Sequence, residues 1–165
     1  MCKKLITAVF TVFLFFISIT AVSALDEVGS ITVNLEEGKK GTSVKNVELE
    51  LIKIADIING QYLLINDLQD TEVNLNTLET AEDMKNAAYT ISKITVSKNI
   101  VGTRKTTNDY GTVKFDQLEK GVYLLQATDI NKYENIVSTL ISVPAFNNES
   151  KNSMNYDISI IPKHS

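Results

Sequence analysis

Apolar and polar residues alternate along several short stretches of the chain. The segments ITVNL (residues 31–35) and VELEL (residues 47–51) both follow this period of two, which places the apolar side chains on one face of a half-buried strand. Ile52 and Ile54 then occupy the opposite face, which predicts that the second strand is covered on both sides near its end or carries a bulge. The same pattern predicts further strands at Tyr62–Ile65, Thr112–Phe115, Val122–Gln126, Val137–Val143 and Tyr156–Ile161.

The period changes to that of a helix after Thr80. Apolar or small residues follow the spacing i, i+3, i+4, i+7, i+11 at Met84, Ala87, Ala88, Ile91 and Thr95, which predicts one buried helical face. Thr80, with Asp83 three residues later, has the spacing of an N-terminal cap. We therefore expect an amphipathic helix over about Ala81–Thr95.

Together these elements indicate a mainly β fold. About seven short strands at such spacings, separated by turn residues, are typical of a β-sandwich, and the helix near 81–95 is a helical insertion. The chain has 165 residues, which leaves room for one domain of ordinary size.

The N-terminus has the pattern of a secretory signal. An apolar run, Leu5–Ile19, follows Lys3 and Lys4, and small residues at 21–24 come next. We predict a signal peptide over residues 1–24, cleaved between Ala24 and Leu25, and a single mature domain over 25–165. The alternative is a membrane anchor, but about 20 apolar residues are needed to cross a bilayer. The mature chain should therefore have no membrane span and lie outside the cell.

Charge and composition exclude several classes of function. Loss of Lys3 and Lys4 leaves 14 of the 16 basic side chains against all 20 acidic ones, a formal charge of −6. Nucleic acid is therefore not expected as a partner, because phosphate binding requires a basic surface. The one cysteine, Cys2, leaves with the signal, so no disulfide is expected.

The residue types also argue against catalysis. The single histidine, His164, and the loss of Cys2 leave no histidine-based triad and no Cys/His metal site within one chain. Glu48 and Glu50 point the same way from one strand, and we interpret them as a solvent-exposed face rather than a catalytic carboxylate pair. The seven glycines are scattered singly at turns, without a phosphate-binding loop. We predict no enzyme activity and no cofactor or metal.

The segment TTNDYGTVKFDQLEKGVYLL (Thr106–Leu125) resembles the turn-strand-turn-strand signature of transthyretin-like (Cna-B-type) surface domains. In that signature a glycine ends a turn, an aromatic residue enters the core and Gly-x-Tyr-Leu follows. We expect the two glycines to supply turn conformations, and the apolar residues of the hairpin to be buried. The matching positions are Gly111, Phe115, Leu118, Gly121, Tyr123 and Leu124.

Four further segments narrow the resemblance to the N-terminal domain of Gram-positive sortase-assembled shaft (major) pilins. They are GSITVNL, NVELELIKIAD, TAEDMKNAAYTISKI, and STLISVP followed by NYDISIIPK. The family implies an immunoglobulin-like β-sandwich on the cell surface, joined to other pilin subunits by a pilus-class sortase, a cysteine transpeptidase. The motif that closes the last segment implies that Lys163 is the sortase acceptor, supported by Tyr156 and Pro162.

The chain departs from the family pattern at several positions. Many such domains carry an internal isopeptide bond, which needs a first-strand lysine, an asparagine or aspartate near the last strand, and a glutamate shortly after Gly-x-Tyr. Here Gly29–Leu35 contains no lysine, Ala127 occupies the glutamate position, and His164 follows Lys163 where family members often have asparagine. We therefore expect no internal crosslink. Met154 stands where the family usually has tryptophan, a substitution expected to preserve burial.

Family shaft subunits continue into further domains and a Leu-Pro-x-Thr-Gly sorting signal, whereas this sequence ends two residues after Lys163. The leading hypothesis is a secreted, non-catalytic, pilin-like structural domain that keeps the acceptor half of the sortase reaction. One alternative is a soluble adhesin or binding module that recognises host protein or glycan. Another is a truncated fragment of a longer pilin. The absence of tryptophan and the core positions of Tyr123 and Tyr156 disfavour a glycan site.

Overall fold

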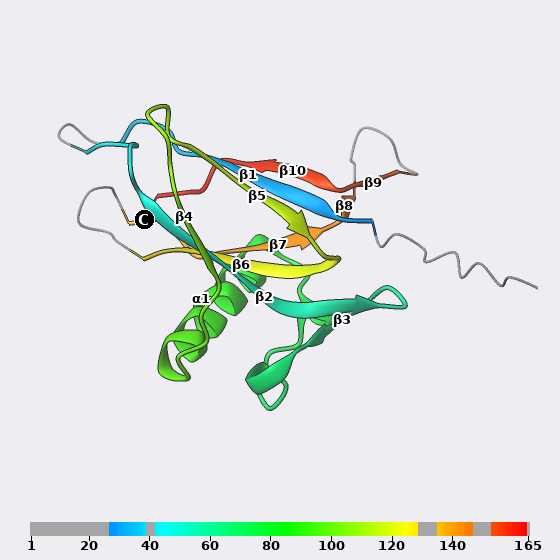
Figure 1. The fold of residues 1–165 in the computed structure, drawn as a ribbon. Coiled ribbons are helices and arrows are strands. Elements are labelled where there is room, and N and C mark those ends of the chain that lie inside the picture. The colour runs from blue at the N-terminus through cyan, green and yellow to red at the C-terminus, as the bar shows by residue number, and fades with distance from the viewer. Residues whose placement is uncertain (1–26, 39–41, 129–134, 147–152, 165) are drawn as a thin grey trace, which may run out of the picture.

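Two β-sheets pack face to face, and a helix covers the outer face of the larger sheet (Figure 1). The structure is a computed structural model, and it describes residues 27–38, 42–128, 135–146 and 153–164. The predicted mainly β sandwich with one helical insertion is confirmed.

The three-stranded sheet has the order β10 (Asp157–Ile160), β1 (Gly29–Asn34) and β5 (Thr112–Leu118). The five-stranded sheet has the order β3 (Gln61–Leu64), β2 (Glu48–Ile58), β6 (Gly121–Ala127) and β7 (Thr139–Val143), with β4 (Thr103–Thr106) also paired to β2. β1 and β10 are parallel, and the other pairs of the two sheets are antiparallel. A small ribbon joins β8 (Ala145–Phe146) to β9 (Met154–Asn155).

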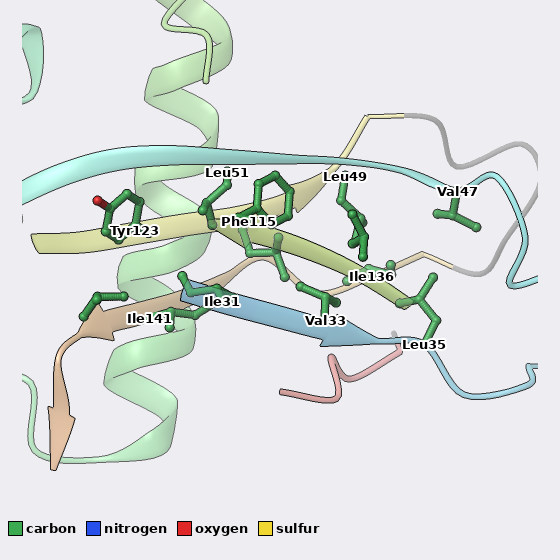
Figure 2. Packing of buried hydrophobic residues seen from close by; sticks show 13 residues of the cluster. Ile31, Val33, Leu35, Val47, Leu49, Leu51, Phe115, Tyr123, Ile136 and Ile141 are labelled. Atoms are coloured by element: carbon green, nitrogen blue, oxygen red, sulfur yellow. The ribbon is translucent and has the colours of Figure 1, made fainter. Parts of the chain in front are cut away.

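The main core fills the space between the two sheets. Figure 2 shows its side chains pointing toward one another from β1, β2, β5, β6 and β7, with Phe115 near the centre. These are the inward positions of the period-two pattern, and their burial supplies the main driving force for folding. The cluster consists of Ile31, Val33, Leu35, Val47, Leu49, Leu51, Val113, Phe115, Tyr123, Leu125, Ile136, Ile141 and Val143.

A second core lies between the five-stranded sheet and α1 (Ala81–Ser97). Ile52 and Ile54 of β2 belong to it, whereas Leu49 and Leu51 belong to the main core. Strand β2 is therefore covered on both faces. Its register against β6 also shifts between Lys53 and Ala55, so both outcomes predicted for this strand occur.

Helix α1 begins as predicted and ends two residues later than predicted. The Thr80 side chain accepts a hydrogen bond from the Asp83 N–H, and the Asp83 carboxylate accepts from the Thr80 N–H, which forms a complete capping box. Four of the five predicted apolar-face positions are buried. Met84 is 46% exposed, so its assignment to the buried face was wrong: it lies in the first turn of α1, beside an open groove.

Several predicted boundaries and environments need correction. Strand β7 begins at Thr139 rather than Val137, and β4, β8 and β9 were not predicted. Met154 is 50% exposed and lies opposite Phe146 in the β8–β9 ribbon, so its expected burial was wrong. Glu50 is only 3% exposed, so it does not belong to a solvent-exposed face.

Candidate functional site

The segment that follows β10 keeps the alternation of the strand. Ile158 and Ile160 pack against the main core, and Pro162 is also buried. Ile161 and Lys163, at the intervening positions, are exposed. Because successive side chains of an extended chain point to opposite faces, the alternation of β10 places Lys163 on the solvent side.

The backbone at Lys163 is attached to the rest of the fold. The Val137 N–H donates a hydrogen bond of 3.0 Å to the Lys163 carbonyl oxygen. His164 forms an antiparallel bridge with Ile136, which is 5% exposed and belongs to the main core (Figure 2). The final residues thus leave the edge of the three-stranded sheet and pair with the segment just before β7, at the edge of the other sheet.

Tyr156 lies at the opposite end of β10. Its carbonyl oxygen accepts a hydrogen bond of 2.9 Å from the Ser30 N–H, and its half-buried ring packs against the main core. A hydrogen bond to the Glu27 carboxylate, together with desolvation, raises the pKa of the Tyr156 phenol. Lys163 follows Tyr156 by seven positions of extended chain, a span of roughly 23 Å. The structure therefore brings Pro162, but not Tyr156, close to the candidate acceptor.

The signature residues in and around the hairpin of β5 and β6 have structural roles. Gly111 has a φ of +76°, so it supplies the predicted left-handed turn. Gly121 has a different role: a Cβ atom there would lie 2.7 Å from the Ala55 carbonyl oxygen, so glycine permits close approach of β6 to β2. Phe115 is buried and Leu118 is partly buried against the main core.

Tyr123 combines a buried ring with a satisfied hydroxyl group. Its Oη donates a hydrogen bond of 2.7 Å to the Glu119 carbonyl oxygen. Burial raises the pKa of the Tyr123 phenol. This tyrosine is therefore a core residue that closes the turn between β5 and β6.

A buried polar network, which the sequence pattern did not reveal, links four parts of the chain. Glu50 Oε1 accepts hydrogen bonds of 3.1 Å from the Gly102 N–H and from Arg104 Nε, while Gln126 Nε2 donates to Glu50 Oε2 at 2.9 Å. Ser92 of α1 donates to Gln126 Oε1 at 2.8 Å. Burial alone raises the pKa of Glu50, but these hydrogen bonds and the Arg104 charge outweigh it and lower the pKa. The network attaches α1 to the five-stranded sheet and links β2, β4 and β6 within it.

The described residues contain little else that resembles a ligand site. No group of three or more His, Cys, Asp or Glu residues among them could hold a metal ion, and none of their helices is long and apolar enough to cross a membrane. An open, mostly apolar groove of about 230 Å³ lies beside Tyr62, Met84 and Leu140. It is smaller than the ~300–1,000 Å³ typical of small-molecule pockets. The predicted cleavage site, Ala24 and Leu25, lies outside the described residues.

Comparison with solved structures identifies the class of fold. The chain is similar to the fimbrial protein FimP from Actonomyces oris, with 19% identity and a TM-score of 0.50, over 84% of this chain and 30% of that one. It is also similar to the T6 backbone pilin of serotype M6 Streptococcus pyogenes, with 17% identity and a TM-score of 0.50, over 86% of this chain and 29% of that one. The chain is thus a pilin-like immunoglobulin-type β-sandwich.

The coverage and the sequence identity of these matches decide which property they establish. The chain spans about 30% of the length of each of these two pilins, and at these identities the likeness establishes the fold. No protein-family model and no curated protein sequence matches the chain. The expected pilin resemblance is therefore confirmed at the level of the fold.

Proposed function

We propose that this chain is a non-catalytic structural domain of a cell-surface pilus that offers the Lys163 amine as acceptor to a pilus-class sortase. The observation that carries the proposal is the placement of Lys163: its side chain is exposed, while Pro162 before it is buried and its carbonyl oxygen is hydrogen-bonded to Val137. The pilin-like fold supports the same assignment.

The reaction needs no catalytic group from this chain. A sorting-signal peptide is held on the sortase cysteine as a thioester, and the Lys163 nitrogen attacks the thioester carbonyl carbon. A C–N bond forms, the C–S bond breaks, and the cysteine sulfur leaves as a thiolate. The lysine ammonium must first lose a proton to a base of the sortase, because only the neutral amine is nucleophilic. Exposure of Lys163 lets the enzyme reach it.

The proposed location follows from the N-terminal sequence. Removal of residues 1–24 would deliver a chain that begins at Leu25 to the cell exterior, where it joins other pilin subunits through Lys163. N-terminal sequencing of the extracellular protein should find Leu25 first. A chain that starts at Met1 in the membrane fraction would contradict secretion in this form.

Sortase-catalysed labelling tests the acceptor role. The purified secreted chain is incubated with a pilus-class sortase and a Leu-Pro-x-Thr-Gly peptide, and the crosslink is mapped by mass spectrometry. We expect one isopeptide bond at Lys163, loss of that product in Lys163→Ala, and normal labelling in Lys120→Ala, which removes another exposed lysine. Equal labelling of Lys163→Ala and the parent, or no labelling of either, would contradict the acceptor role.

A binding module is a second candidate function, and Tyr110 is the observation that favours it. This tyrosine is 87% exposed at the tip of the turn between β4 and β5. The turn is ordered, since Asn108 Oδ1 accepts hydrogen bonds from the N–H groups of Tyr110 and Thr112. An exposed aromatic ring on a rigid turn can act as an anchor for a host protein. Saturable binding to matrix proteins that Tyr110→Ala abolishes would support this function.

A further inference from the structure

The pairing of β10 with β1 ends before the chain reaches Lys163. The last paired residues are Val33 and Ile160. Lys163 and His164 then meet a different partner, residues 136 and 137, which precede β7. The acceptor lysine therefore lies where the backbone transfers from one sheet to the other.

Val137 is held in place by the residues before and after it in the chain. Its neighbour Ile136 is buried in the main core, and β7 begins two residues later at Thr139. The Thr139 hydroxyl also donates a hydrogen bond of 3.0 Å to the Val137 carbonyl oxygen. The N–H of Val137 that binds the Lys163 carbonyl oxygen thus belongs to a segment held by the core and by the sheet.

A fixed backbone matters for an acceptor that lies outside the paired strands. Segments of this kind are more mobile than strands unless they are tied to the fold. A mobile acceptor must be ordered when it reaches the enzyme, which slows productive attack, whereas a pre-positioned one is already oriented.

We infer that Val137, through its peptide N–H, is a positioning residue for the Lys163 acceptor. This inference rests on the proposed sortase function. Val137 does not touch the reacting amine. It holds the backbone from which the Lys163 side chain projects, so its effect should appear in the efficiency of transfer to Lys163 rather than in the identity of the acceptor.

Two substitutions at the same position test the inference. Val137→Pro removes the N–H donor, whereas Val137→Ala keeps the donor and shortens the side chain. With acyl donor in excess, kcat and KM for the domain are measured below the unfolding temperature of every variant. We expect Val137→Pro to lower kcat/KM for Lys163 about tenfold or more, while Val137→Ala stays within about twofold of the parent.

A small amine-acylating reagent provides the control for exposure. It should label Lys163 equally in all three proteins, because the inferred effect is on orientation within the enzyme complex. A merely structural role of Val137 would shift the unfolding temperature and leave the sortase kcat/KM unchanged. Equal kcat/KM values for Val137→Pro and the parent would therefore overturn the positioning role and leave the acceptor role intact.

Hydrogen exchange keeps the inference testable if Val137→Pro does not fold. In the parent, the Val137 amide should exchange at least about 100-fold more slowly than an unprotected amide. If Val137→Pro does not fold, Ile136→Ala takes its place. This substitution weakens the burial that holds the segment carrying the Val137 N–H, and it should lower kcat/KM for Lys163. Rapid exchange of the Val137 amide, or an unchanged kcat/KM in Ile136→Ala, would overturn the inference. Absence of labelling in the parent would instead overturn the proposed function on which it rests.

Discussion

Glu50 shows how a residue can be placed on the correct face of a strand and still be misjudged. The alternation of β2 puts Glu48 and Glu50 opposite Leu49 and Leu51, as predicted. That face is closed to solvent at Glu50, however, because α1 and the segment around Gly102 cover it there. Burial of Glu50 is compatible with folding because its carboxylate oxygens are hydrogen-bonded by Gly102, Arg104 and Gln126.

Removal of the Glu50 carboxylate should be strongly destabilising. Glu50→Ala leaves the buried Gln126 amide and the Gly102 N–H without their acceptor, and we expect a loss of about 2–4 kcal/mol in the free energy of unfolding. Glu48→Ala is the matched control, since Glu48 is more exposed and its pairing with Arg104 is looser, at 3.7 Å. It should cost about 1 kcal/mol or less. Urea unfolding measures both, and equal losses would contradict a structural role specific to Glu50.

The lowered pKa of Glu50 predicts the direction of its pH dependence. The unfolded carboxyl group titrates near its ordinary value of 4.5, and the folded one titrates lower. The unfolded chain therefore takes up the proton first as the pH falls. The stability that this group contributes is complete above about pH 5 and is lost as the pH falls through the folded pKa.

Glu50→Gln isolates this contribution, because glutamine does not titrate. We expect the difference in unfolding free energy between the parent and Glu50→Gln to be largest near neutral pH and to shrink toward about pH 3. Urea unfolding at a series of pH values measures this difference. A difference that stays constant over that range would show that the folded and unfolded pKa values of Glu50 are the same.

At the scale of the elements, the hydrophobic pattern predicted those strands whose side chains are buried in a core, and it missed strands that lack such burial. Strands β1 and β5 alternate because one face is buried in the main core, whereas β2 and β6 carry apolar residues on both faces because each lies between the two cores. All four strands were expected. β4 was missed because its sequence, TRKT, is wholly polar and its position depends on pairing with the edge of β2. The two-residue strands β8 and β9 are too short to show a period.

The candidate site also has a part that the sequence predicted and a part that it did not. Lys163 and Pro162 were predicted because a local motif carries them. The contact of Lys163 with Val137 joins residues far apart in the sequence, and no local pattern encodes which distant segment the residues after β10 will meet. The covering of Glu50 by α1 is hidden from the sequence for the same reason.

The capping box of α1 gives a prediction at this scale. Thr80→Ala removes the side-chain acceptor of the Asp83 N–H and the hydroxyl that donates to Asp83 Oδ2 at 2.7 Å. We expect a loss of about 1 kcal/mol in the free energy of unfolding. Thr90→Ala, at an exposed position within the helix, should be neutral or slightly stabilising. Chemical denaturation of the two variants checks the prediction, which fails if Thr80→Ala is as stable as the parent.

At the scale of the whole molecule, the sandwich is held by contacts between its first and last strands. β1 and β10 are adjacent and parallel, and the Ser30 hydroxyl donates a hydrogen bond of 2.6 Å to Asp157 Oδ1 across them. Ile31 and Val33 of β1 belong to the main core, and Ile158 and Ile160 of β10 pack against it. Strands from the two ends of the chain are thus joined by hydrogen bonds and burial, and β1 has no lysine that could join them covalently.

Among the described lysines that form ion pairs, Lys53 has the least exposed side chain. Its Nζ lies 2.9 Å from both Asp56 Oδ1 and Glu119 Oε2. Desolvation lowers the pKa of Lys53, but the hydrogen bonds and charges of Glu119 and Asp56 outweigh it and raise the pKa. A lysine held as an ammonium ion is not a nucleophile, so these contacts should remain ion pairs.

We therefore predict that the purified chain contains no internal isopeptide bond. Condensation of a lysine with asparagine would release ammonia, and condensation with aspartate or glutamate would release water. The intact mass should show neither loss beyond removal of the signal peptide, and the chain should unfold in urea as one cooperative domain stabilised by its cores. Lys53→Met, which keeps the apolar stem over Gly121 but removes the charge, should leave the mass unchanged relative to its own sequence. An intact parent lighter by one ammonia or one water, with the deficit absent from Lys53→Met, would place a covalent bond at Lys53 and make the ion-pair interpretation wrong.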